Sequence, residues 1–223
     1  YVCTLNSDTE VQPGALDRLV DWLAEHPEYG AVAPRLCDPD GSVQRACMRF
    51  PTYGSALCYD SWWGTFWPGR RVVARYEMHD FDHLHDVDVD QPPGACCMLR
   101  TDEWRALGGF DETLSLFFND VDLCKRLWRA GRRIRYLASA VVLHHRGAST
   151  RNFARMLVLW HRNRLAYYRK HHGLLGVTWL RLCVRLRIWE EWLRIGRRNR
   201  HDPAQKRSQR DHLRQSVRSL SEP

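Results

Sequence analysis

The sequence predicts an α/β fold followed by a basic, amphipathic helical extension. In residues 1–150, short runs rich in β-branched and aromatic residues alternate with segments whose apolar residues recur at helical spacing. Residues 151–223 change in character and combine Leu and Trp with many Arg residues. We therefore expect an α/β domain over residues 1–150 and a helical tail over residues 151–223, with a disordered end from Gly196 onward.

The charge is divided between these two parts. Residues 1–150 hold 16 Lys/Arg and 21 Asp/Glu, and residues 151–223 hold 18 and 5, so the net charges are −5 and +13. A strongly basic tail suits a polyanionic surface, either anionic lipid or nucleic acid. No recognised nucleic-acid-binding motif accompanies the charge, so we expect no nucleic-acid partner.

The first predicted strand, residues 1–5, leads into a short acidic loop. Its residue types suit a buried strand. Asn6 and Asp8 follow two positions apart, so their side chains can point the same way. Ligands bind outside the carboxyl ends of strands in open α/β sheets. An oxygen-rich pair there can hold a hard divalent cation, which in turn holds a diphosphate. A plain turn is the alternative, because Asn, Ser and Asp are ordinary turn residues.

A helix, a strand and a turn are expected next. Residues 13–26 place Pro in a first helical turn and carry an apolar face. Residues 31–36 predict a short strand, and the Asp-Pro-Asp-Gly sequence at 38–41 predicts a turn after which residues 42–45 pair back as a hairpin. Residues 50–85 are predicted to be irregular and aromatic, either covering a site, contacting a partner or packing over the core.

The remaining part of the first domain alternates strands and helices again. Strands are expected at 87–89, 96–99 and 134–143, with a tight turn at 92–95. A short helix should follow Thr101 as its cap, since Asp102 and Glu103 suit its first turn. A further helix should open at residues 119–122 and end at Gly131. The last strand ends at His144 and His145.

The tail is expected to form two helices separated by Gly173. The first covers residues 151–170, and the second has an apolar stripe flanked by Arg. The stripe consists of Leu175, Trp179, Leu182, Leu186, Trp189 and Leu193. A basic helix of this kind over residues 151–195 suits an anionic membrane surface. Packing onto the first domain, or pairing with a second copy, is an equal alternative.

The cysteines and the absence of targeting signals indicate a cellular location. None of the eight cysteines forms a Cys-x-x-Cys pair, so we interpret them as reduced thiols of a cytoplasmic protein rather than zinc ligands. The sequence has no signal peptide and no run of about twenty apolar residues. We expect a cytoplasmic protein, peripheral on the inner face of the membrane. Because Tyr1 opens directly into a strand, we also expect an N-terminal part to be missing from the chain.

Several motifs, in this order, resemble a family 2 glycosyltransferase, and most of all the rhamnosyltransferase-like members. The resemblance covers residues 1 to about 150. The matching residues are Asn6-Ser7-Asp8-Thr9, Val11-x-Pro13-Gly14-Ala15-Leu16, Gly30-Ala31-Val32-x-Pro34-Arg35-Leu36-x-Asp38-Pro39-Asp40-Gly41-Ser42-x-Gln44-Arg45, Gly94-Ala95, Gly108-Gly109-Phe110-Asp111, Asp120-Val121-Asp122-Leu123-Cys124 and His144-His145-x-Gly147-x-Ser149.

The resemblance implies a GT-A fold, a Rossmann-like α/β sandwich, of which this chain holds only part. It implies metal-dependent transfer of a sugar, with inversion, from a nucleotide-diphosphate donor to a hydroxyl. Asn6 and Asp8 would then belong to the metal loop with Mg²⁺ or Mn²⁺, Asp8 being the principal contact. His144 would lie beside the metal and diphosphate, and Asp120 would be the general base. The family's N-terminal nucleotide-binding half lies outside this chain.

Further residues are candidates for contacts with donor or acceptor. Gly94 lets the backbone approach a sugar closely. Asp122 could equally be a first-turn helix acid, as could Asp120, and Trp104 could stack on a sugar or simply pack. Asn119 stands where such enzymes usually carry an acid, and Ser7 where they usually carry Pro. The full candidate set is Ser7, Gly94, Ala95, Trp104, Asn119, Asp122 and His145.

The expected function is sugar transfer in cell-envelope polysaccharide synthesis. The donor would be a nucleotide sugar, with dTDP-rhamnose as one candidate, and the acceptor a glycan or a polyprenyl-linked saccharide. The alternative is an inactive fragment or degraded copy that binds a membrane surface or a partner through its basic tail.

Overall fold

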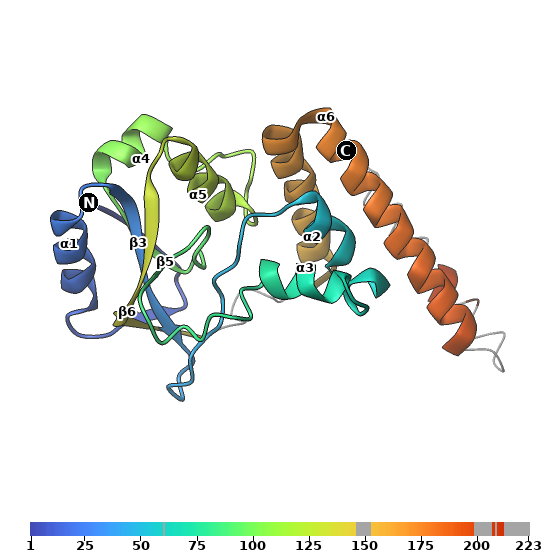
Figure 1. Ribbon diagram of the computed structural model, residues 1–223, viewed down its shortest axis with the longest axis horizontal. Helices are drawn as coiled ribbons and strands as arrows, with labels where there is room; N and C mark the ends of the chain where they lie inside the picture. Colours follow the sequence, from blue (N-terminus) through green and yellow to red (C-terminus); the bar gives the residue numbers. More distant parts are fainter. Residues whose placement is uncertain (60, 146–152, 199–206, 208, 212–223) are drawn as a thin grey trace. The chain divides into compact units, whose positions relative to one another are not determined.

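The computed structural model describes residues 1–59, 61–145, 153–198, 207 and 209–211 (Figure 1). Gly147 and Ser149 of the last motif, and most of the tail end expected to be disordered, lie outside these residues. The chain divides into two compact units, Tyr1–Phe50 with Ala74–Asn152 and Pro51–Val73 with Phe153–Pro223. Residues 51–73, which the sequence analysis left in the first domain, therefore group with the C-terminal helix.

The first unit is built on a mixed sheet with the strand order β1-β5-β3-β6-β2, and β4 also pairs with β6. Only β3 and β6 are parallel; every other pair is antiparallel. This is the expected GT-A-like α/β fold. The strands are β1 Val2–Leu5, β2 Thr9–Val11, β3 Tyr29–Cys37, β4 Val87–Asp88, β5 Cys96–Leu99 and β6 Arg133–His144.

Helices cover both faces of this sheet. They are α1 Ala15–Glu25, α4 Thr101–Leu107 and α5 Asn119–Arg129. Alternation along the strands sends Val32 and Met98 to the side of α1, where Leu19 and Leu23 pack. Ala31 and Leu99 face the other side, where α5 contributes Leu123, Cys124 and Leu127 and α4 contributes Trp104. Figure 1 shows α1 and α5 on opposite sides of the strands.

The structure corrects the prediction for the first strand. β1 is half-exposed rather than buried, and Leu5 is 49% exposed. Among the described residues β1 pairs only with β5, so it lies at an edge of the sheet and its faces are incompletely covered. The three-residue strand β2 was not predicted, and it places the acidic loop between two strands.

Helix ends differ by small amounts from the prediction. α1 begins at Ala15 rather than Pro13, after Gly14 with φ 73°. Thr101 is the first residue of α4 and not its cap, because Arg100 holds the extended cap conformation. The expected hairpin is confirmed, since Cys37 pairs with Val43 and the Asp38 amide donates to the Ser42 carbonyl at 2.8 Å.

The second unit contains α2 Tyr53–Cys58, a 3₁₀ turn at Trp62–Gly64, the start of α3 Gly69–Tyr76, and the long helix α6 Phe153–Arg198. α6 is interrupted at Gly173, which has φ 67° and ψ −161°. The Tyr168 hydroxyl and the Trp179 indole donate to the carbonyls of Thr52 and Tyr53, at 2.8 and 2.9 Å. Residues 50–85 are thus partly helical, not irregular as predicted.

None of the helices in the described part of the chain is long and apolar enough to span a bilayer.

Candidate active site

The sheet brings the acidic loop beside the end of the last strand. β2 pairs Thr9 with His144, and the Asp8 carbonyl accepts the His145 amide at 2.8 Å. This pairing places the Asp8 carboxylate oxygen Oδ1 3.5 Å from His144 Nε2, with both side chains largely buried. Two predicted metal-site residues, 136 positions apart in the sequence, therefore lie together.

The third predicted metal residue contributes differently. Asn6 is exposed, and hydrogen bonds of its backbone hold the loop in place. Its backbone N–H donates to the Ala95 carbonyl at 2.9 Å. Its carbonyl accepts the Thr9 hydroxyl at 2.6 Å. Ser7 is exposed at the tip of the turn. Ala95 is itself buried, so its carbonyl positions the acidic loop.

A carboxylate oxygen and an imidazole nitrogen at this separation can together bind a divalent cation: the carboxylate suits Mg²⁺ or Mn²⁺, and a nitrogen ligand favours the transition metal Mn²⁺ over Mg²⁺. The described residues contain no group of three or more His, Cys, Asp or Glu side chains arranged to hold a metal. Two protein ligands nevertheless fit this chemistry, because Mg²⁺ is usually bound through one or two carboxylates together with substrate phosphates and water. The donor set thus fits a cation that is completed by a bound diphosphate.

Asp120 occupies the first turn of α5 and is half-buried. Burial raises the pKa of its carboxyl group, while hydrogen bonds from backbone N–H groups, including those of Val121 and Gly94, partly offset the rise. The Val121 amide donates to Asp120 Oδ1 at 2.8 Å. A narrow pocket beside the carboxyl is lined by Thr4, Pro93, Gly94, Phe110 and other residues of the core. A carboxylate with a raised pKa is a stronger base, which is what proton abstraction needs.

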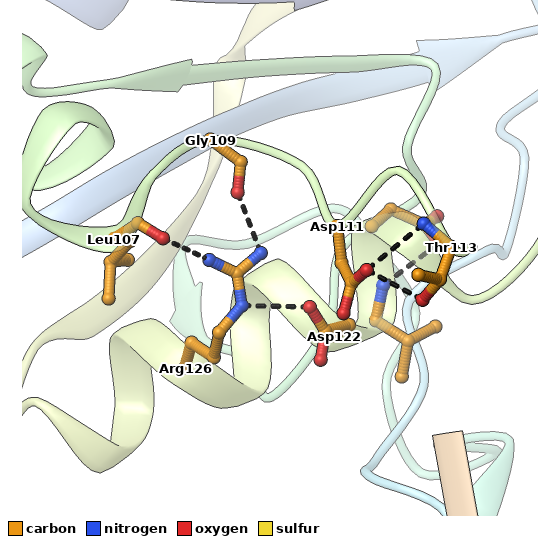
Figure 2. Close-up of polar contacts among 8 residues, drawn as sticks. Leu107, Gly109, Asp111, Thr113, Asp122 and Arg126 are labelled. Atoms are coloured by element: carbon orange, nitrogen blue, oxygen red, sulfur yellow. Dashed lines mark hydrogen bonds and ion pairs between the residues drawn. The ribbon is translucent and has the colours of Figure 1, made fainter. Parts of the chain in front are cut away.

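Asp122 lies in the same turn but is fully buried. Figure 2 shows its carboxylate accepting from Arg126 Nε at 2.7 Å, while the other guanidinium nitrogens donate to the carbonyls of Leu107 at 2.8 Å and Gly109 at 2.7 Å. This arrangement fits a structural role better than a contact with substrate.

The other candidates lie mainly in packed or peripheral positions. Trp104 packs edge-on against Phe110 with ring centroids 5.2 Å apart, at the periphery of the core. His145 is exposed, and its ring lies 3.8 Å from the Glu10 carboxylate. Asn119 is the first residue of α5 and is half-buried. In the part of the chain that the structure describes, the observed contact between side chains of two predicted residues is that of Asp8 with His144.

Two residues beside His144 were missed as site residues. Gln44 and Asp38 belong to the hairpin after β3, and Gln44 contacts both the ring and the backbone of His144. Sequence reasoning treated them as turn and hairpin residues. Two signals were available in the sequence. Asp38 directly follows the buried strand β3, and both residues lie in a motif shared with a known family.

The comparisons with known proteins agree with this fold. A mixed sheet with helices on both faces is consistent with the GT-A-like class of α/β folds. Residues 1–166 match the family model described as glycosyltransferase like family 2. Since this match covers well over half of the chain, the chain belongs to that family.

Several relatives have names that describe sugar transfer or O-antigen synthesis. The N-acetylglucosaminyl-diphospho-decaprenol L-rhamnosyltransferase of Mycobacterium tuberculosis is 32% identical over 174 residues, which cover 78% of this chain and 56% of the relative. The pre-mycofactocin glycosyltransferase of the same species is 36% identical over 162 residues, covering 69% and 28%. The O-antigen biosynthesis protein RfbC of Myxococcus xanthus is 32% identical over 161 residues, covering 66% and 11%. The chain spans about half the length of the first of these relatives, and less of the others.

Proposed function

We propose that the protein carrying this chain transfers a sugar, with inversion, from a nucleotide-diphosphate donor to a hydroxyl of a glycan or lipid-linked acceptor. The observation that carries this proposal is the pairing of Asp8 with His144 in the same unit as the half-buried Asp120. The backbone N–H of Asn6 donates a hydrogen bond to the Ala95 carbonyl. This hydrogen bond links the loop that carries Asp8 to the segment that contacts Asp120.

Each group has a defined task in such a displacement. Asp120 takes the proton of the acceptor hydroxyl while the new C–O bond forms and the bond to the diphosphate breaks. The raised pKa of Asp120 strengthens it as a base. Asp8 and His144 would hold the divalent cation, Mg²⁺ or Mn²⁺, which neutralises the leaving diphosphate when bound. Attack from the face opposite to the leaving group inverts the sugar carbon.

The relatives suggest the substrates. We propose rhamnose as the transferred sugar and dTDP-rhamnose as the donor, because the M. tuberculosis relative is named a rhamnosyltransferase. That name also specifies a saccharide on a decaprenol diphosphate, so a polyprenyl-linked acceptor in cell-envelope synthesis is our proposal here.

Alanine variants of both acidic residues test the mechanism. In the protein that carries this chain, Asp120→Ala should lower the rate of transfer by about 10²–10⁴-fold, which is the usual contribution of a general base. Asp8→Ala should lower transfer similarly and weaken the dependence on Mn²⁺. The exposed Asp102, also in the first turn of a helix, provides the matched control Asp102→Ala, which should retain full activity. Turnover like that of the wild type in Asp120→Ala would exclude the mechanism.

A second function is favoured by the surface of the second unit. Half of the predicted stripe on α6 is solvent-exposed: Leu175 is 79%, Leu182 46% and Trp189 56% exposed, and the other three residues are half-buried. A different face, containing Leu180 and Cys183, is buried. Trp67, in the segment before α3, is 73% exposed. We propose that these side chains, together with the surrounding arginines, hold the unit against the anionic inner face of the membrane.

A shallow hollow in the same unit fits this role. It is lined by Ser61, Thr65, Arg187 and Arg194 among other residues. Arg187 and Arg194 each pair with a glutamate through Nη1, and their remaining guanidinium nitrogens are suited to the phosphate of a lipid headgroup. If the chain has no transferase activity, such surface binding is the alternative function.

A further inference from the structure

Gln44 makes a set of contacts that determines the orientation of its side-chain amide. The residue is buried, with only 2% of its surface exposed. Its Nε2 donates to Asp38 Oδ1 at 2.7 Å and to the backbone carbonyl of His144 at 2.8 Å. A carboxylate oxygen and a carbonyl oxygen can only accept, so the NH₂ group must face them. The amide oxygen Oε1 therefore faces the His144 ring.

The orientation of the amide in turn determines the tautomer of His144. Gln44 Oε1 lies 3.0 Å from His144 Nδ1. Because an amide oxygen only accepts, Nδ1 must carry a hydrogen. In the neutral ring the lone pair is then on Nε2. Nε2 is the atom that lies 3.5 Å from the Asp8 carboxylate, so the lone pair is on the nitrogen next to the oxygen donor.

We propose that Gln44, held by Asp38, is a positioning residue that presents His144 Nε2 as a ligand for the divalent cation bound with Asp8. The proposal rests on the metal-dependent function proposed above. Histidines that ligate metals almost always donate their other N–H to a fixed acceptor, which sets the tautomer and the ring orientation. Here that acceptor would be a buried glutamine amide, which Asp38 holds in place from the other side.

The tautomer gives a readout that does not depend on enzyme activity. Long-range ¹H–¹⁵N NMR spectra of the 223-residue chain, with His144 assigned by comparison with His144→Gln, report which ring nitrogen carries the hydrogen. The wild-type protein should show the Nδ1–H form for neutral His144. A predominant Nε2–H form would overturn the proposal without any variant of Gln44.

Mn²⁺ binding tests the consequence for the metal. Gln44→Leu keeps the approximate size of the side chain but removes the acceptor. We expect its Kd for Mn²⁺, measured by calorimetry, to rise about 10–100-fold, and the tautomers of His144 to become mixed. Ser42→Ala is the matched control, because Ser42 also bonds to Asp38 in this hairpin yet has no observed bond to His144. It should change neither quantity.

The failures of the two proposals can be distinguished. If Asp8→Ala binds Mn²⁺ as tightly as the wild type, the metal site itself is wrong and both proposals are overturned. If Asp8→Ala loses affinity while Gln44→Leu keeps both the wild-type affinity and the Nδ1–H form, only the role of Gln44 is overturned. If Asp8→Ala and Gln44→Leu both bind Mn²⁺ more weakly, and the tautomer of His144 changes in Gln44→Leu, both proposals are supported.

Discussion

At the scale of single residues, the backbone at Gly94 lies directly against the carboxyl group of Asp120. A Cβ atom at position 94 would lie 2.5 Å from Oδ2 of Asp120 and 2.9 Å from its Cβ. Gly94 has no positive φ, so the requirement for glycine is steric and not conformational. A sugar contact at this glycine stays a prediction. In the structure, the group that approaches it is the carboxyl group proposed as the base.

The buried environment of Asp120 should cost the fold stability at neutral pH. Its folded pKa is raised above the ordinary value of 3.8, mainly by burial. The protonated form is thus favoured in the folded state, and that stabilisation is lost as the pH rises through the folded pKa. We expect Asp120→Asn to raise Tm at pH 7 while transfer falls by about 10²–10⁴-fold.

Thermal unfolding across pH would check this prediction. The difference in Tm between Asp120→Asn and the wild type should be largest at neutral pH and should shrink as the pH falls toward 3.8. A variant that is less stable than the wild type at pH 7 would show that the ionised carboxylate is stabilised by its amide hydrogen bonds more than burial penalises it.

The sequence predicted some site residues well and others poorly, for physical reasons. The strand-end position predicted a site at Asp8, and the family resemblance placed His144 at the same site; the structure brings these two side chains together. The contact of Gln44 with His144 was missed, since a single buried amide leaves no periodic pattern and its place in the shared motif was the one signal for it. For Asp122 the sequence left open a substrate contact and a first-turn helix acid, and its i, i+4 spacing to Arg126 was a signal of an ion pair within the helix.

At the scale of secondary-structure elements, Arg126 joins α5 to the end of α4. Its guanidinium contacts the fully buried Asp122 (Figure 2). It also donates to the carbonyl of Leu107, the last residue of α4, and to that of Gly109, which follows α4. Asp111, in the connection, accepts the amide and hydroxyl of Thr113 at 3.0 and 2.6 Å. These bonds position the N-terminal turn of α5, in which Asp120 lies.

Removing this guanidinium should destabilise the first unit substantially. Arg126→Met would leave the Asp122 carboxylate buried without its cation, and two carbonyls without their donor. Breaking a buried ion pair in this way typically costs about 3–5 kcal/mol. Denaturant unfolding would measure the loss, with Arg129→Met on the exposed end of the same helix as the control. A change below about 1 kcal/mol, the usual contribution of an exposed pair, would contradict the structural role.

The prediction of elements failed where local signals compete. α2 and α3 were missed because Gly, Pro and aromatic residues around them suggest irregular structure. α2 is nevertheless started by a capping box in which Thr52 and Ser55 exchange hydrogen bonds. For α6, helical spacing predicted the helix correctly, but spacing alone cannot tell which of two apolar faces is buried.

At the scale of the whole molecule, the net charge follows the two units. Residues 1–50 and 74–152 carry a net charge of −5, and residues 51–73 and 153–223 carry +13. The second unit also exposes Trp63, Phe66 and Trp67, each more than half exposed. Aromatic and basic side chains on one unit are the combination found at membrane–water interfaces.

Vesicle flotation tests the surface role. The chain should float with vesicles rich in phosphatidylglycerol at low ionic strength, and stay unbound with neutral phosphatidylcholine vesicles. High salt should release it, because each basic residue near an anionic surface contributes only about 1 kcal/mol and that attraction is screened. Leu175→Glu and Trp189→Glu together should weaken binding, since they place charges among the exposed apolar side chains.

The control and the competing explanation use the same samples. Leu116→Glu changes an exposed apolar residue of the acidic unit and should leave flotation unaffected. If the chain fails to float at low salt but forms a dimer that Leu175→Glu and Trp189→Glu dissociate, the exposed face of α6 binds a second copy instead. Flotation that persists at high salt would mean that apolar insertion, and not the charge of +13, dominates the attachment.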